Sequence, residues 1–157
     1  MDLETRIARL EAAESIRILK AHYCDLCDTG YDVEALGSLF VEDATWDGGN
    51  LGTFEGLDAI KRFFGHMPKV LRFAIHHVTN SAVDVADDAL SATGTWYLLQ
   101  SATTAASNEA VWIAGRYQDE FVKVGDSWRF ARITIETKLF TPSGAGWADE
   151  PFIQVGS

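Results

Sequence analysis

The 157-residue sequence is poor in several kinds of residue, and each scarcity excludes a class of protein. Basic side chains are the clearest case, because 13 Lys and Arg stand against 23 Asp and Glu, which leaves a formal net charge of −10. A nucleic-acid-binding protein needs a clustered basic face to pair with phosphates, and an anionic membrane surface repels a chain of this charge. We therefore expect neither nucleic acid nor membrane lipid as a partner.

Long apolar runs are also missing, because no segment approaches the roughly 20 apolar residues that span a bilayer. The N-terminus is acidic and then amphipathic, without the basic-then-apolar pattern of a secretory signal. Disorder is not expected, because 47 % of the residues are hydrophobic and 11 % are aromatic. These features predict a cytoplasmic protein with a single domain over residues 1–157, a length that suits one core.

Cysteine is limited to Cys24 and Cys27, which form a CxxC pattern. A redox CxxC belongs at a strand-to-helix junction, where the helix dipole lowers the thiol pKa, whereas this one lies inside a helical pattern. A structural zinc site needs further ligands, and the sequence has no second CxxC and no HxxxH. We expect two reduced thiols facing a core, with neither a metal nor a cofactor.

Hydrophobic periodicity predicts helices first and strands afterwards. Helices are expected at 2–28, 33–40 and 57–65, and a phase slip near Ala12–Ala13 favours a bend or two abutting helices in the first. Strands are expected at 44–47, 73–80, 82–85, 90–101, 110–124 and 127–140, with an irregular tail at 141–157. This order predicts an α+β fold, in which the N-terminal helices pack in the concave face of a curved, mainly antiparallel sheet. A pocket lined by aromatic side chains is expected between the two layers.

Two residues from opposite ends of this arrangement are candidates for chemistry. His76 and His77 are adjacent on a predicted strand, so only one of them faces a given side of the sheet. Asp28 ends the first helix, where the helix dipole disfavours a carboxylate and a histidine partner would relieve it. A carboxylate on one ring nitrogen fixes the imidazole tautomer and supports the other nitrogen as a base. Helix-end solvation for Asp28, and a structural role for the histidine, are the alternatives.

Several short strings, taken in order, resemble the SnoaL-like branch of the nuclear transport factor 2-like superfamily. The first is ILKAHYCDLCD at residues 18–28. The others are Leu36-x-x-Leu39-Phe40-x-x-Asp43-Ala44-Thr45-Trp46, Gly56-x-x-Ala59-Ile60, His76-His77-x-Thr79-Asn80, Ala92-Thr93-Gly94-x-Trp96-Tyr97-Leu98, Gly115-Arg116-Tyr117-x-Asp119-Glu120-Phe121 and Trp128-Arg129-Phe130. The resemblance covers about residues 5–140 and implies a cone-shaped α+β barrel with a deep apolar pocket, whose mouth the tail helps to cover.

Within that branch the chain looks similar to lyases, namely scytalone dehydratase, bile acid 7α-dehydratase and hexachlorocyclohexane dehydrochlorinase. The His–Asp dyad of these enzymes falls on His76 and Asp28, and their pocket tyrosine falls on Tyr23. The resemblance implies a cofactor-independent elimination on a small, apolar, cyclic substrate. We expect the substrate to contact Trp46, Phe54, Phe73, Trp96, Gln100 and Trp112. Gln100 lies near the position of a second Asp of the bile acid enzyme, so an acid role there is in doubt.

Several alternatives stay open at this point. The same pocket could serve an isomerase or an epoxide hydrolase, and some superfamily members are ligand-binding or accessory subunits without catalysis. Strand parity does not decide which of the cations Lys20, Arg116, Arg129 and Arg132 faces the pocket. By analogy with the lyases we expect a homo-oligomer that associates through the outer sheet face, with a trimer favoured over a dimer.

Overall fold

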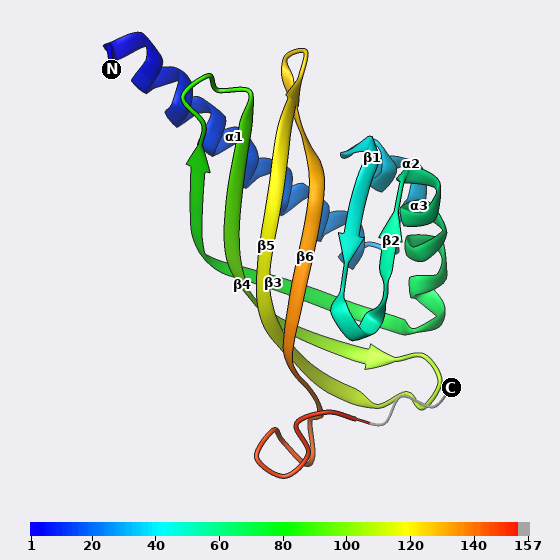
Figure 1. Ribbon diagram of the computed structural model, residues 1–157. Helices are drawn as coiled ribbons and strands as arrows, with labels where there is room; N and C mark the ends of the chain where they lie inside the picture. The colour runs from blue at the N-terminus through cyan, green and yellow to red at the C-terminus, as the bar shows by residue number, and fades with distance from the viewer. Residues whose placement is uncertain (154–157) are drawn as a thin grey trace.

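A computed structural model describes residues 1–153, and its helices precede the main strands as predicted (Figure 1). The helices are α1 (Leu3–Asp28), α2 (Val33–Gly37) and α3 (Leu57–His66), with short 3₁₀ turns at Gly49–Leu51 and Met67–Lys69. The strands are β1 (Phe40–Asp47), β2 (Thr53–Glu55), β3 (Leu71–Val85), β4 (Ser91–Thr104), β5 (Ala110–Val124) and β6 (Ser127–Pro142). The predicted α+β class is confirmed.

The six strands form one curved sheet in the order β2-β1-β6-β5-β4-β3, with α1 packed across one face (Figure 1). All neighbours are antiparallel except β1 and β6, which run parallel. The sheet is not closed, because β2 and β3 are its two edges. The expected cone-shaped barrel is therefore an open, curved sheet around α1.

Helix α1 is one continuous helix, so the predicted bend near Ala12–Ala13 is wrong. Asp2 caps its start by accepting a hydrogen bond from the Thr5 amide at 2.8 Å. The phase slip arises because the helix carries two apolar stripes on different sides. Ala12, Ala13, Ile16 and Tyr23 face the core, whereas Leu3 and Leu10 are 68 % and 72 % exposed.

Several element ends differ from the prediction. The helix expected at 33–40 stops at Gly37, and Phe40 instead begins β1, which is longer than the expected 44–47. The segments expected as two strands at 73–80 and 82–85 form one strand, β3, with a register shift between Thr79 and Ala82. Asn80 has a φ of +53° within that shift, a conformation that Asn tolerates better than most residues.

The core lies between α1 and the inner face of the sheet. Phe40, Phe64, Phe121 and Phe130 are fully buried there, and Tyr23 of α1 packs edge-on against Phe130 at 5.5 Å between ring centroids. Edge-to-face contacts of this kind add to the stabilisation that aromatic burial provides. No helix within residues 1–153 is both long enough and apolar enough to cross a membrane.

The tail expected at 141–157 is described as far as Ile153, and 154–157 lie outside the described residues. It leaves β6 after Pro142, turns, and returns to Phe140, where the Ile153 amide donates to the Phe140 carbonyl at 2.8 Å. Phe140 also forms an isolated bridge with Phe152. The tail therefore packs against the end of β6.

Candidate functional site

His76 and Asp28 are brought together where the C-terminus of α1 meets the edge strand β3. The Asp28 Oδ1 and His76 Nδ1 atoms are 2.5 Å apart. The backbone amide of His76 also donates to Asp28, at 2.9 Å to Oδ2 and 3.2 Å to Oδ1. Because β3 is an edge strand, its outward amides have no strand partner, and the Asp28 carboxylate satisfies one of them.

This geometry decides which ring nitrogen of His76 carries the proton. An ionised carboxylate only accepts hydrogen bonds, so the contact places the proton on Nδ1 and leaves the lone pair on Nε2. The last turn of α1 contains no basic residue to offset the negative helix end, so His76 supplies the donors that Asp28 needs. A neutral imidazole held in this tautomer is suited to act as a general base through Nε2.

Gln100 is the polar residue nearest to His76 in the sheet register, since it lies directly opposite on β4. The His76 amide bonds Asp28 rather than β4, so this is a non-hydrogen-bonded pair, the type in which side chains approach most closely. Gln100 is buried. A side-chain amide at this place, across from His76, is positioned to bind a ligand oxygen.

Tyr23 lies in the aromatic core and has no hydrogen bond to His76 or Asp28 within the described part of the chain. Its hydroxyl accepts a hydrogen bond from Trp46 Nε1 at 3.1 Å, and the buried Cys27 thiol is a second hydrogen-bond partner. Burial raises the pKa of Tyr23 well above its ordinary value, so the hydroxyl stays protonated.

The predicted aromatic contacts fall into three groups. Trp46 and Phe54 both stack on Phe63 of α3, with centroid distances of 4.3 and 4.4 Å, and form an aromatic wall below β1 and β2. Trp96 is buried and packs edge-on against Phe121, so it belongs to the core. The third group, Phe73 and Trp112, lies on the other face of the sheet.

Phe73 and Trp112 lie on the outer face of the sheet, so the prediction that they share a pocket with His76 is wrong. They are 49 % and 38 % exposed. Trp112 pairs through Ser101 with Ile75, the neighbour of His76, and adjacent strand residues point to opposite faces. Together with Ile75, Tyr97 and Leu99 they form an exposed patch that we call the outer apolar face.

None of the four candidate cations bonds the dyad. Arg116 lies over the ring of Tyr97 on the outer apolar face, and Arg132 pairs with Asp47 at 3.6 Å. Arg129 lines a surface pocket of about 290 Å³ between α2, β1 and α3. Lys20 is buried, with its ammonium 2.8 Å from Asp119 Oδ2 on β5.

The Lys20–Asp119 pair is the charged feature that sequence reasoning missed. Its side chains are 1 % and 0 % exposed, and the ammonium lies 3.3 Å from the ring centroid of Tyr117. Burial raises the pKa of Asp119 to about 6, although Lys20 opposes the shift. A lone lysine on the apolar stripe of α1 was the available signal, because Lys is almost never fully buried without a partner.

The cysteines are free and buried, as predicted. Burial raises the pKa of Cys24 to about 11 and that of Cys27 well above its ordinary value, so neither forms a reactive thiolate at neutral pH. No three His, Cys, Asp or Glu side chains of residues 1–153 are grouped so as to hold a metal ion.

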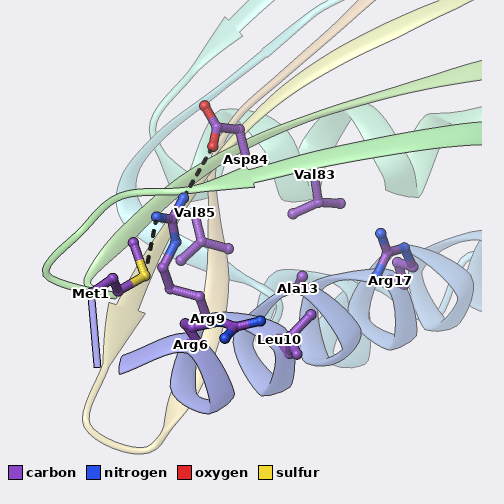
Figure 2. A pocket seen from close by; sticks show the side chains of 9 residues that line it. All are labelled: Met1, Arg6, Arg9, Leu10, Ala13, Arg17, Val83, Asp84 and Val85. Carbon is purple, nitrogen blue, oxygen red and sulfur yellow. Dashed lines mark hydrogen bonds and ion pairs between the residues drawn. The ribbon is translucent and has the colours of Figure 1, made fainter. Parts of the chain in front are cut away.

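A groove of about 370 Å³ lies beside the first half of α1, away from the dyad (Figure 2). Arg9 crosses it to reach Asp84 at 3.5 Å and Asp87 at 3.1 Å near the end of β3. Arg6 and Arg17 also line the groove. Side chains of α1 thus bond the sheet at several points, namely Arg9 to Asp84, Arg17 to Ser81, Lys20 to Asp119, Tyr23 to Trp46 and Asp28 to His76.

Comparison with known proteins agrees with this architecture. Residues 8–134 match the family model described as a SnoaL-like domain. Among proteins with curated descriptions, none matches the sequence. The resemblance noted from the sequence strings is confirmed by the family match.

Three solved structures show how far the similarity extends. A candidate scytalone dehydratase from Novosphingobium aromaticivorans is 25 % identical with a TM-score of 0.78, covering 90 % of this chain and 91 % of the other. A LinA-type3 hexachlorocyclohexane dehydrochlorinase from Novosphingobium barchaimii is 23 % identical with a TM-score of 0.77, covering 87 % and 93 %. A nuclear transport factor 2-like superfamily protein from Salmonella enterica is 19 % identical with a TM-score of 0.74, covering 87 % and 97 %.

Proposed function

The chain belongs to the SnoaL-like domain family, and from that premise we propose that it is a cofactor-independent lyase. The observation that carries the proposal is the hydrogen bond between Asp28 and His76 Nδ1, which leaves Nε2 as the basic nitrogen. The structural neighbours include dehydratase- and dehydrochlorinase-type enzymes, which supports elimination as the reaction class.

The proposed reaction is a syn elimination of water or of a halide. His76 Nε2 takes a proton from a carbon that a neighbouring carbonyl or leaving group has acidified. The electron pair of the broken C–H bond forms the C=C bond, and the leaving group departs with its own bonding pair. A departing hydroxide takes the proton back from the imidazolium and leaves as water, whereas a halide leaves as the anion and the imidazolium then releases its proton to water. Asp28 stabilises the imidazolium without taking its proton, and the proton transfer by the positioned His76 is worth about 10²–10⁴-fold in rate.

The other polar groups are assigned to the oxygen that gains charge. Gln100, opposite His76, donates its amide N–H to a substrate carbonyl. Tyr23 is assigned to donate its hydroxyl proton to the same oxygen or to the leaving hydroxyl. The aromatic wall of Trp46 and Phe54 favours a small, apolar, cyclic substrate.

The test compares His76→Ala with His77→Ala on a panel of cyclic β-hydroxyketones and chlorinated rings. His77 is exposed and lies on the opposite side of β3, so its variant controls for loss of any strand histidine. We expect kcat to fall about 10²–10⁴-fold in His76→Ala only. Equal turnover by both variants would sink the proposal. A product that is isomeric with the substrate would point to the isomerase alternative, and saturable binding without turnover to a binding protein.

We also propose a homo-oligomer assembled through the outer apolar face, with a trimer favoured. An exposed group of five large apolar side chains on one sheet face is typical of an interface rather than of free surface. The free thiols of Cys24 and Cys27 suit the reducing cytoplasm, where we expect the protein to act.

A further inference from the structure

Helix α1 forms two buried or partly buried acid–base pairs with the sheet, and only one of them is the proposed dyad. Lys20 meets Asp119 on the inner strand β5, and Asp28 meets His76 on the edge strand β3. The two helix residues are eight positions apart, which is about 12 Å along a helix that rises 1.5 Å per residue. Bonds at two separate points on a stiff helix fix both its position along the sheet and its rotation.

The Lys20 ammonium has no second buried carboxylate to pair with among the described residues. Asp119 is the one acidic side chain among the buried residues of the described chain, so an ammonium that moved away from it would meet only aromatic rings. The rings around the ammonium are those of Tyr117, Tyr23 and Trp96, at 3.3, 4.9 and 5.4 Å from their centroids. Separating two charges inside an apolar core is strongly unfavourable. The pair therefore permits only one register of α1.

The Asp28 end does have an alternative, which is water. The Asp28 side chain is 19 % exposed and lies at the negative end of the helix dipole, where the last turn has no basic residue. Helix ends fray readily, and a carboxylate there is well solvated. A 2.5 Å contact with His76 thus depends on something else that holds α1 in place.

We propose that the Lys20–Asp119 ion pair is a positioning element for the catalytic dyad, setting the register of α1 so that the Asp28 carboxylate reaches the ring and amide of His76. Lys20 and Asp119 act through Asp28 and do not touch the substrate. The inference rests on the proposed function for its catalytic meaning, but the geometry that it explains is measurable without a substrate.

The experiment uses the double variant Lys20→Met/Asp119→Leu, which replaces both charges by apolar groups of similar size. A single variant leaves one buried charge without a partner and is strongly destabilised, whereas an apolar pair in place of a buried ion pair is commonly well tolerated. Two readouts by NMR report on the dyad, namely the nitrogen shifts that identify the Nδ1–H tautomer of His76 and the hydrogen exchange of the His76 amide. Ile133→Val, a fully buried residue opposite Asp119 on β6, is the packing control.

We expect the double variant to fold, to lose the preference for the Nδ1–H tautomer, and to exchange the His76 amide about tenfold faster or more. His77, its neighbour on the opposite side of β3, should not change, and Ile133→Val should resemble the parent at both positions. An unchanged tautomer and an unchanged His76 amide in the folded double variant would overturn the proposal. If turnover proves independent of His76 while these NMR changes occur, the lyase assignment fails and the positioning role stands.

Discussion

Two buried or partly buried acid–base pairs join α1 to the sheet, and they differ in their exposure and in the residues around them. Lys20–Asp119 spans 2.8 Å between α1 and an inner strand, with both side chains at most 1 % exposed. Asp28–His76 spans 2.5 Å at an edge strand, with side chains 19 % and 7 % exposed. The first pair is surrounded by aromatic rings, whereas the second lies opposite the buried Gln100 in the sheet register.

The difference in exposure suits the Lys20–Asp119 pair to a structural role and the Asp28–His76 pair to proton transfer. A pair sealed in the core cannot exchange protons with a substrate, so its charges serve to fix the packing. A pair at the margin keeps one ring nitrogen available and remains sensitive to its surroundings. The same helix therefore carries one pair that fixes its packing on the sheet, Lys20–Asp119, and one pair whose ring nitrogen remains available for proton transfer, Asp28–His76.

The largest effect on folding stability is expected when one partner of the buried Lys20–Asp119 pair is replaced. Lys20→Met leaves the Asp119 carboxylate buried without its partner, which costs about 3–5 kcal/mol of folding stability. Adding Asp119→Leu should restore most of that loss. Urea unfolding of both variants measures the difference, and a single variant as stable as the parent would show that the two pairs do not differ in this way.

Replacing a residue of the Asp28–His76 pair should lower the catalytic rate more than the folding stability. Asp28→Asn keeps the shape of the side chain but removes the charge that stabilises the imidazolium, so we expect kcat to fall about 10²–10⁴-fold once a substrate is known. The free energy of unfolding should change by no more than about 1 kcal/mol, the loss of a partly exposed hydrogen bond. A folded Asp28→Asn protein with parental kcat would contradict the distinction.

A pH titration sharpens the comparison further. Burial raises the pKa of Asp119 to about 6 in the folded chain, whereas an unfolded Asp titrates near 3.9. The folded state therefore binds more protons between about pH 4 and pH 6, and the stability contributed by this group is lost as the pH rises through that window. Two pKa units correspond to about 3 kcal/mol.

The measurement compares urea unfolding of the parent with Asp119→Asn from pH 4 to pH 7. The free energy of unfolding of the parent should fall relative to that of the variant as the pH rises. Asp126→Asn in the exposed β5–β6 turn serves as the control and should follow the parent. Parallel curves for the parent and Asp119→Asn would be inconsistent with a raised pKa.

The smallest effect is expected at the exposed link between α1 and β3. The side chains of Asp84 and Asp87 are 88 % and 91 % exposed, so their pairs with Arg9 are screened by water and salt. Arg9→Ala should cost less than about 1 kcal/mol in low salt and less still in 1 M NaCl. A cost equal to that of Lys20→Met would show that burial is not what distinguishes these pairs.

The sequence was sufficient to predict the order of the elements and that Asp28 and His76 lie together, but not which face of the sheet each side chain occupies. Period-two alternation and the turn at Gly125–Asp126 locate β5 and β6, and the family strings indicate Asp28 and His76. The facing of Phe73 and Trp112 depends on register across three strands, which the alternation within one strand does not set. Lys20 and Asp119 are 99 positions apart, so no local pattern relates them.

The parallel pairing of β1 with β6 has a consequence for the route by which the chain folds. β6 lies between β1 and β5, so Phe40–Asp47 finds its main partner only after Ser127–Pro142 has been synthesised. Contacts between such distant parts of a chain slow folding, because a long loop must close before they form. The β3–β6 meander can therefore assemble first, with β1, β2 and α3 docking last.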